Sequence, residues 1–152
     1  MTDVSLRPAS LDDAVYLLLL RNDKLTRANS RSTGEISRDQ HLRWLTQTLV
    51  DPRRRLYIAV ANHETCVGTG RLDRGDVDVE LSLTVDPLHR GRGYARQIVR
   101  ALTLEAGGTL PKTAEIATSN IPSILAFLHE GFTPDKVVDE DERRWLWVRR
   151  ES

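Results

Sequence analysis

One segment of the chain alternates strictly between apolar and polar residues. Its apolar positions are Val77, Val79, Leu81, Leu83 and Val85, and its polar positions are Asp78, Glu80, Ser82 and Thr84. A period of two sends successive side chains to opposite faces of a sheet. The pattern therefore predicts a strand with one apolar and one polar face, which Asp86-Pro87 ends.

The other periodicities predict helices and strands in mixed order. A period near 3.6 residues predicts helices over 11–21, 37–51, 94–106 and 120–131. Short apolar runs bounded by turn residues predict strands over 4–7, 56–61, 66–72, 113–118 and 144–148, with another near Phe132. Residues 22–36 are polar and aperiodic, which predicts a long loop with at most one helical turn. Because helices and strands do not alternate strictly, the fold class is α+β, or irregular α/β, rather than a doubly wound sheet.

Composition indicates one globular domain over residues 1–152. The 22 basic and 22 acidic residues cancel, so we expect no nucleic-acid partner and only local anion sites. A single cysteine, Cys66, excludes an intrachain disulfide and fits a reducing compartment. The N-terminus does not read as a signal peptide, and the longest apolar run, 14–20, is far shorter than the roughly 20 residues of a membrane span. We therefore expect a cytoplasmic protein with no membrane partner.

Candidate chemistry follows the alternating strand, where Arg90-Gly91-Arg92-Gly93 leads into the helix predicted from Tyr94. Glycine lets a backbone approach a ligand closely, and the first N–H groups of a helix lack partners. Together with the helix dipole and two arginines, this turn is typical of a phosphate site. The stretch lacks the glycine and lysine spacing of a Walker loop and the third glycine of a dinucleotide fingerprint.

The spacing Arg90-x-x-Gly93-x-Ala95 resembles the Arg/Gln-x-x-Gly-x-Gly/Ala signature of the GNAT N-acetyltransferases. The later stretch Asn120…Ala126-Phe127…Gly131-Phe132 is similar to the Asn…Ala-Tyr…Gly-Phe of that family. The order of elements agrees over nearly the whole chain. The resemblance implies a GNAT fold, in which about four helices flank a mixed, mostly antiparallel sheet of six to seven strands.

The resemblance also implies acetyl-CoA as the co-substrate, with no metal. The backbone of the turn and the following helix start would hold the pyrophosphate, backbone groups of the strand would pair with the pantetheine arm, and a helix-capping side chain would reach that arm. The residues concerned are Leu83, Val85, Arg90, Gly91, Arg92, Gly93, Tyr94, Ala95 and Asn120.

Acetyl transfer to an amine needs a base, because an amine with a pKa near 10 is almost fully protonated at neutral pH. Glu80, on the polar face of the strand, is the candidate catalytic base, with Asp78 as the next candidate; Glu80 could instead pair with an arginine across the sheet. A backbone N–H near Leu83 would stabilise the oxyanion. The tyrosine that usually protonates the departing thiolate falls at Phe127, which cannot donate a proton. A thiol is a fair leaving group as the anion, so the acid could be dispensable.

The early region is similar to bacterial GNAT enzymes that acetylate amino groups of nucleotide-linked sugars. That resemblance implies a small-molecule amine acceptor, with Arg21, Asn29, Ser30, Arg31 and His41 as substrate-binding residues. Asn and Ser side chains suit sugar hydroxyls, and Arg27 or Arg31 suits a diphosphate. Two alternatives stay open, a ribosomal-protein or peptide N-terminal acetyltransferase and a non-catalytic acyl-CoA-binding module. The sequence leaves the oligomeric state open, and a homodimer is compatible with it.

Overall fold

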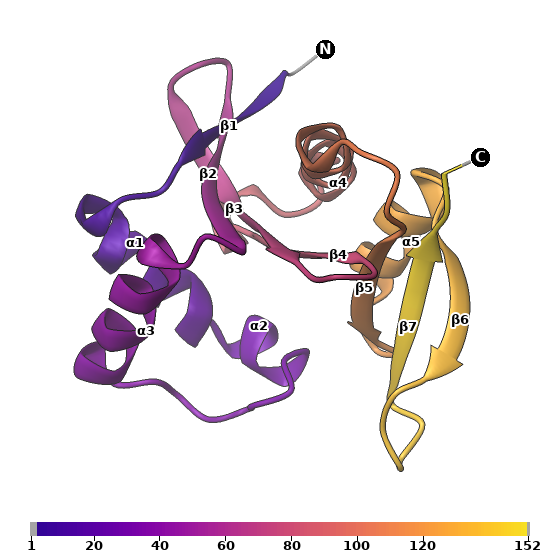
Figure 1. Ribbon diagram of the computed structural model, residues 1–152. Helices are drawn as coiled ribbons and strands as arrows, with labels where there is room; N and C mark the ends of the chain where they lie inside the picture. The colour runs from indigo at the N-terminus through magenta and orange to yellow at the C-terminus, as the bar shows by residue number, and fades with distance from the viewer. Residues whose placement is uncertain (1–2, 152) are drawn as a thin grey trace.

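The computed structural model describes residues 3–151 and holds a seven-stranded sheet in the order β1-β2-β3-β4-β5-β7-β6 (Figure 1). Its strands are β1 (Val4–Pro8), β2 (Arg54–Ala61), β3 (Thr65–Arg74), β4 (Val79–Val85), β5 (Lys112–Ala117), β6 (Thr133–Val137) and β7 (Arg144–Arg149). The helices are α1 (Ala14–Asn22), α2 (Lys24–Ala28), α3 (Arg38–Val50), α4 (Tyr94–Ala106) and α5 (Ile121–His129), with 3-10 turns at Leu11–Asp13 and Pro87–His89. β4 and β5 run parallel, whereas the pairs on either side of them are antiparallel. The predicted fold class is confirmed.

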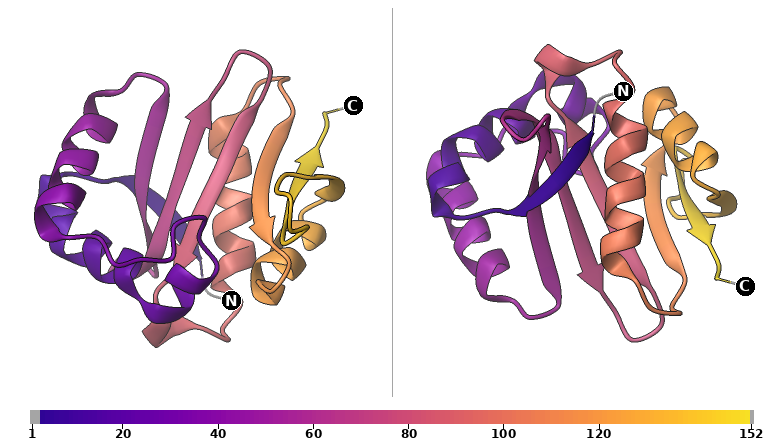
Figure 2. Two further views of the ribbon diagram at one scale, coloured as in Figure 1. Left: turned by 90° about the horizontal axis from the view of Figure 1, so that it is seen from below. Right: turned by 90° about the horizontal axis from the view of Figure 1, so that it is seen from above.

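Helices cover both faces of the sheet (Figure 2). On one face α4 and α5 pack over β2–β5 and β7 in the larger core, around Ile98, Leu102 and Phe127. On the other face α1 and α3 pack over β2 in a smaller core, through Leu17 and Leu45. β2 serves both cores because alternate side chains point to opposite faces. Its run of buried apolar residues is therefore continuous, as the sequence at 56–61 predicts.

The sheet splits between β4 and β5. These strands pair only at Val79↔Lys112 and Glu80↔Thr113, although β4 continues to Val85. β4 begins at Val79 rather than at Val77, so the predicted strand is two residues too long at its start. The N–H of Gly75 donates to the carbonyl of Asp78 at 2.8 Å, which closes the turn from β3 into β4. Val77 lies on that turn and is 76% exposed.

The polar segment 22–36 contains one short helix, α2, in agreement with the prediction of at most one turn. Asp23 caps it, accepting hydrogen bonds from the N–H and the hydroxyl of Thr26. The Asn22 side chain bonds both the N–H and the carbonyl of Ile36, at 2.8 and 2.9 Å, and so ties the two ends of the segment together. α2 is the helix beyond the four expected. No helix within residues 3–151 is both long and apolar enough to cross a membrane.

Candidate active site

A cavity of about 520 Å³ opens where β4 and β5 part. β4, the turn after it, the start of α4, the start of α5 and α2 all contribute to its wall. Of the residues expected to hold acetyl-CoA, those that line this cavity are Leu83, Val85, Arg90, Gly91, Gly93, Tyr94, Ala95 and Asn120. Segments far apart in the sequence therefore meet around one space, which we call the cofactor cleft.

The backbone of β4 faces the cofactor cleft with unused hydrogen-bonding groups. The N–H of Val79 donates to the carbonyl of Pro111, on the β5 side, at 3.0 Å. Backbone groups in a strand alternate in direction, so Leu81, Leu83 and Val85 turn their N–H and C=O groups to the same side. β5 no longer pairs with β4 at these positions. The edge at Leu83 and Val85 is thus free to receive an extended ligand.

The turn before α4 is held open by two glycines in the left-handed region. Gly91 has φ +77° and Gly93, the N-cap of α4, has φ +80°. A Cβ at either residue would meet no atom within 4 Å, so the space beside them is empty. The N–H groups of the first turn of α4 receive no side-chain cap. This turn can accept an anion on its backbone.

The arginines at this turn already have partners. Arg90 forms an ion pair with Asp23 at the start of α2, and Arg96 pairs with Glu130 at 3.2 Å. Arg92 lies 3.5 Å from the His89 ring nitrogen and does not line the cofactor cleft. Backbone groups, rather than free cations, are therefore the main feature of the turn.

The far wall of the cofactor cleft is the start of α5. Asn120 caps this helix, and its Oδ1 accepts a hydrogen bond from the Ser123 N–H at 3.4 Å, which leaves its amide N–H groups to donate elsewhere. Phe127 is 3% exposed and packs edge-to-face on Phe132 with the ring centroids 5.0 Å apart. Phe127 thus serves the core, and no proton donor occupies its position.

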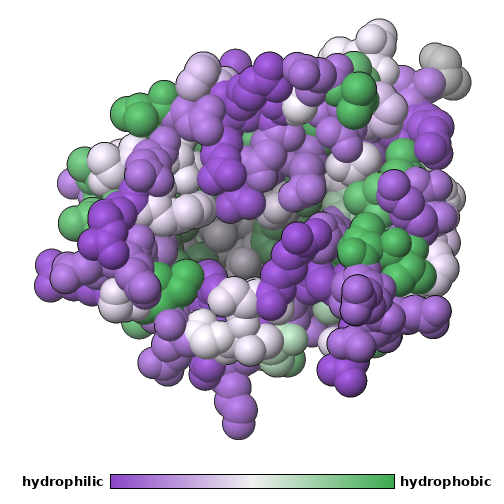
Figure 3. All heavy atoms as spheres, turned by 60° about the horizontal axis from the view of Figure 1, so that its bottom comes forward, coloured by the Kyte–Doolittle hydropathy of each residue, from purple (hydrophilic) through white to green (hydrophobic). Residues whose placement is uncertain are grey.

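A second cavity, of about 220 Å³, lies between the sheet and helices α1 and α3. It shares Leu83 and Thr84 with the cofactor cleft, so the two spaces meet at the end of β4. Its polar lining comprises Arg21, His41, Trp44, Thr69, Arg71, Ser82 and Thr84. In Figure 3 the molecular surface is hollowed near the centre of one face, and hydrophilic residues form most of the rim. We call this second space the acceptor cavity.

Glu80 lies on the same face of β4 as Ser82 and Thr84, which line the acceptor cavity. It is two residues, about 7 Å, before Ser82 along the strand. The alternative in which an arginine across the sheet pairs with Glu80 is not seen, because Arg71 pairs with Asp73 at 3.0 Å. Burial raises the pKa of the Glu80 carboxyl, and the charges of Asp73 and Glu115 raise it further while Arg71 opposes them. The carboxyl is therefore a stronger base than an exposed glutamate.

The sequence from residue 3 to residue 133 matches the family model described as an acetyltransferase (GNAT) domain. The chain belongs to the GNAT family. It is therefore an acetyl-CoA-dependent N-acetyltransferase of the GNAT type, and the resemblance at the turn before α4 identified the family correctly. None of the curated proteins matches the sequence significantly.

Solved structures share the GNAT fold over nearly the whole chain. A domain from Methanocaldococcus jannaschii DSM 2661 has a TM-score of 0.86 at 18% identity, covering 99% of this chain and 100% of that one. Spermidine N-acetyltransferase from Vibrio cholerae, solved with CoA and spermine, has a TM-score of 0.83 at 16% identity, covering 97% and 95%. Aminoglycoside acetyltransferase AAC(6')-Ib with coenzyme A and kanamycin has a TM-score of 0.79 at 18% identity, covering 97% and 95%. At such identities the likeness shows the fold alone.

The structure divides the predicted substrate-binding residues of this GNAT enzyme into two groups. Arg21 and His41 line the acceptor cavity. Asn29 and Ser30 line the cofactor cleft instead, where Asn29 accepts a hydrogen bond from the Ser119 hydroxyl at 2.9 Å. Arg31 lines neither space and forms an ion pair with Glu115 on β5. The segment 22–36 contacts both spaces, because its Ile36 lines the acceptor cavity while Asn29 and Ser30 line the cofactor cleft.

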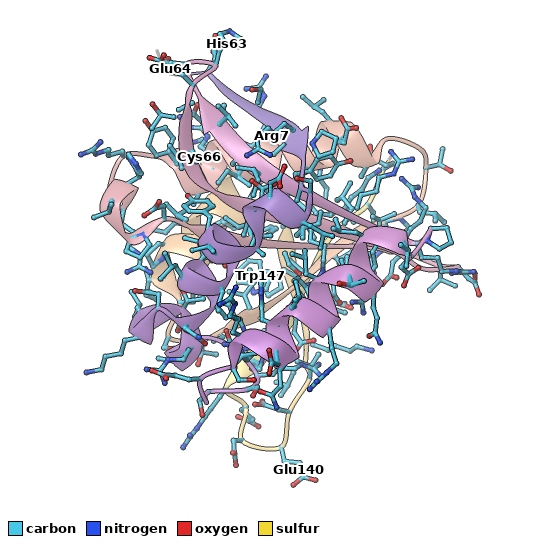
Figure 4. All side chains as sticks on the ribbon, turned by 90° about the vertical axis from the view of Figure 1, so that its left-hand side faces the viewer. Arg7, His63, Glu64, Cys66, Glu140 and Trp147 are labelled. Atoms are coloured by element: carbon cyan, nitrogen blue, oxygen red, sulfur yellow. The ribbon has the colours of Figure 1, made fainter. Side chains whose placement is uncertain are left out.

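His63 and Cys66, two residue types that can bind metals, lie three residues apart in the sequence. His63 and Glu64 lie at the tip of the β2–β3 hairpin, and Cys66 lies further down β3 (Figure 4). Within residues 3–151 no group of three His, Cys, Asp or Glu side chains could hold a metal ion.

Sequence reasoning missed Arg71 and Trp44 as residues of the acceptor cavity. The Arg71 guanidinium lies 5.7 Å from the Trp44 ring centroid, in cation–π range. Trp44 lies on α3 and is half-buried. The alternation of Arg71 with buried Leu72 in β3 indicates only that Arg71 faces away from the larger core, because the sequence does not show which helix packs against that face.

Proposed function

We propose that this enzyme transfers the acetyl group of acetyl-CoA to the primary amine of a small polar molecule, and that this amine belongs to a nucleotide-linked sugar. The observation that carries the proposal is the meeting of two cavities at Leu83 and Thr84. One space has the backbone groups that a pyrophosphate and an extended arm need. The other is lined by Ser82 and Thr84, which share a face of β4 with Glu80, although Glu80 itself lines neither space. A thioester and an amine entering from opposite sides would meet at this point.

On the cofactor side, the N–H groups of 91–95 bind the pyrophosphate of acetyl-CoA through the empty space beside Gly91 and Gly93. Leu83 and Val85 pair with the pantetheine arm as an added strand would. The Asn120 amide donates to the arm from the opposite wall. A free N–H near Leu83 stabilises the oxyanion that forms as the amine attacks the thioester carbon.

On the acceptor side, Glu80 accepts the proton that the ammonium must lose before attack. Its distance from Ser82 along the strand leaves room for a water between the carboxylate and the amine. The neutral amine adds to the thioester carbon, and collapse of the resulting oxyanion breaks the C–S bond, so that the thiol leaves as the anion. The nitrogen then loses its second proton, which passes through water to the thiolate, because Phe127 has no proton to donate.

The acceptor class rests on the similarity of the early region and on the lining of the acceptor cavity. Ser82, Thr84 and Thr69 offer hydroxyls suited to a sugar ring, and Arg21 offers charge for a phosphate. A sugar amine flanked by oxygen substituents is less basic than the amine of lysine. A larger fraction is thus free at neutral pH, which suits a site whose usual proton donor is replaced by Phe127.

The test is thiol release from acetyl-CoA across nucleotide-linked amino sugars, free amino sugars, polyamines, aminoglycosides and peptides with free N-termini. We expect the highest kcat/KM with a nucleotide-linked amino sugar. A preference of tenfold or more for peptides would replace this proposal with an N-terminal acetyltransferase. A preference for polyamines or aminoglycosides would retain the small amine and reject the sugar.

A further inference from the structure

Arg21, whose side chain lines the acceptor cavity, has a cationic nitrogen without a hydrogen-bond partner in the described part of the chain. Nη1 of Arg21 is buried and has no hydrogen-bond partner within residues 3–151, while Nη2 of the same side chain donates to the Ser32 carbonyl at 3.1 Å. A buried donor on a charged group costs free energy when it is left unpaired. Arg21 lines the cavity, so a ligand bound there can supply the missing acceptor.

A second guanidinium, that of Arg71, lines the same cavity from β3. Its Nε donates to Asp73, at 3.0 and 3.2 Å to the two carboxylate oxygens, which fixes the side chain while its two Nη groups keep donors for other partners. The neighbouring Trp44 ring supports the guanidinium from α3. Two arginines from different elements therefore converge on one space of about 220 Å³.

Nothing in the lining of the acceptor cavity opposes an anion. Among the residues that the structure describes, neither aspartate nor glutamate lines this cavity. His41 adds no positive charge at neutral pH, because burial and the charge of Arg21 lower its pKa. The charged side chains of the lining are thus Arg21 and Arg71 alone, and Arg71 is also paired with Asp73 at 3.0 Å.

The arginines also lie close to the point of acetyl transfer. Arg71 pairs in register with Ser82, and Gly70 pairs with Leu83, where the two cavities meet. Adjacent residues of a strand are about 3.3 Å apart and neighbouring strands about 4.8 Å apart. An anion bound by Arg71 would therefore belong to the same small molecule as the amine that reacts beside Leu83.

We propose that the acceptor carries an oxyanion, a phosphate or carboxylate, within a few bonds of its amine, and that Arg21 and Arg71 select it. This inference rests on the proposed function, because it assumes that the amine reacts where the two cavities meet. A nucleotide-linked amino sugar is one acceptor of this kind, because its diphosphate is an oxyanion. It also separates this enzyme from the fold relatives solved with spermine and kanamycin, which are cationic ligands.

The test is calorimetry on the full chain saturated with CoA, so that phosphate groups cannot enter the cofactor cleft. The probes are glucosamine 6-phosphate against glucosamine, glutamate against glutamine, UDP, and spermidine. We expect the phosphate-bearing probes to bind at least tenfold more tightly than their neutral partners, and spermidine not to compete with them. Preference for glutamate over the phosphates would identify the oxyanion as a carboxylate. Tighter binding of spermidine than of every anionic probe would overturn the inference.

Four variants assign the effect to residues. Arg21→Gln and Arg71→Gln should each weaken the anionic probes at least tenfold and leave the affinity for CoA unchanged. The matched control is Arg53→Gln, since Arg53 bonds the carbonyl of Arg74 and the carboxylate of Asp76 and lines neither space. Arg21→Lys keeps the charge without the planar fork, so a partial loss of affinity in this variant would show that the loss in Arg21→Gln is not caused by misfolding. Equal effects of the Arg21, Arg71 and Arg53 variants would overturn the inference.

Acetyl-transfer assays on the same panel keep the two proposals distinguishable. Anion binding that depends on Arg21 and Arg71, with transfer only to peptides or polyamines, would reject the proposed function and retain the anion site. Transfer to amino sugars irrespective of phosphate, with unchanged KM in both arginine variants, would retain the proposed function and reject the anion site.

Discussion

The two cavities on either side of β4 are built from different parts of the chain. The cofactor cleft is mainly a backbone site, formed by a strand edge without a partner and a glycine turn at a helix start. The acceptor cavity is a side-chain site, to which α1, α3, β2, β3 and β4 each contribute one or a few residues. The backbone groups are the same in every chain that adopts the fold. Side chains that come from several separate elements can vary without changing the fold. The first site is therefore typical of the family, and we expect the second to select the acceptor.

The largest effect expected is on turnover, and it tests whether the acceptor side supplies the base. Glu80→Gln should lower kcat by roughly 10²–10⁴ while the Kd for acetyl-CoA stays unchanged. Because burial raises the pKa of Glu80, the wild-type rate should fall with decreasing pH at values above the ordinary glutamate range, and the variant should lack this limb. Steady-state pH profiles and calorimetry measure both.

Asp78→Asn is the control for that prediction. Asp78 lies just before β4 and accepts a hydrogen bond from the Thr113 hydroxyl at 3.3 Å. We expect its removal to change kcat by only a few fold. A large loss in Asp78→Asn with near-normal turnover in Glu80→Gln would reverse the two roles.

The second prediction concerns the backbone character of the cofactor cleft. Gly93→Val should weaken acetyl-CoA binding at least tenfold, about 1.4 kcal/mol, because the side chain would occupy the space left for the pyrophosphate. Gly108→Val at the other end of α4 is the matched control, since Gly108 also has a positive φ, +68°, and open space around it. It bears the same backbone strain away from the cleft. Similar losses of binding in both variants would mean that strain, not the ligand site, explains the effect.

The third prediction tests the link between the acceptor segment 22–36 and β5. Glu115 on β5 accepts hydrogen bonds from Arg31 and from Arg144, the latter at 3.0 Å. Burial opposes its ionisation, but the two arginines hold the pKa of Glu115 below its usual range. Glu115→Gln should lower the free energy of unfolding by about 1–2 kcal/mol near neutral pH, because a partly buried Arg144 loses its partner.

The pH dependence of that loss has a definite sign. A depressed carboxyl pKa contributes stability above its unfolded value, about 4.3, and that contribution disappears as the pH falls through the lower folded value. The difference between wild type and Glu115→Gln in urea unfolding should therefore shrink below about pH 4. Glu140→Gln, on the exposed β6–β7 turn seen at the lower edge of Figure 4, should show no such difference at either pH.

The smallest expected effect concerns the ion pair between Arg90, in the turn before α4, and Asp23, at the start of α2. Arg90 is held by Asp23, so it is only partly available to a phosphate. Asp23→Asn keeps a good N-cap for α2 and removes the charge, and it should tighten acetyl-CoA binding by about two- to fivefold, the range of an exposed ion pair. A weaker affinity in calorimetry would mean that Asp23 positions Arg90 for the cofactor rather than competing for it.

The sequence by itself determined the fold class and the cofactor turn. The alternation in 79–85 and the glycines before Tyr94 are local signals, because strand period, helix start and left-handed turn each depend on neighbouring residues. The predicted start of β4 was wrong, because Val77 continues the alternating pattern although the hydrogen bond between Gly75 and Asp78 places Val77 in a turn. A local pattern thus predicts the presence of a strand or helix more reliably than the residue at which it begins or ends.

Tertiary structure alone decided which residues face the acceptor. Arg21, His41, Arg71 and Ser82 are spread over 62 positions of the sequence, from 21 to 82, and only the packing of α1 and α3 on the sheet brings them to one cavity. The same packing decided that Arg31 would pair with Glu115, which is 84 residues away. No local period encodes such contacts, because they depend on how two separately formed surfaces meet. The family could therefore be identified from the sequence, whereas the charged residues that line the acceptor cavity could be identified only from the tertiary structure.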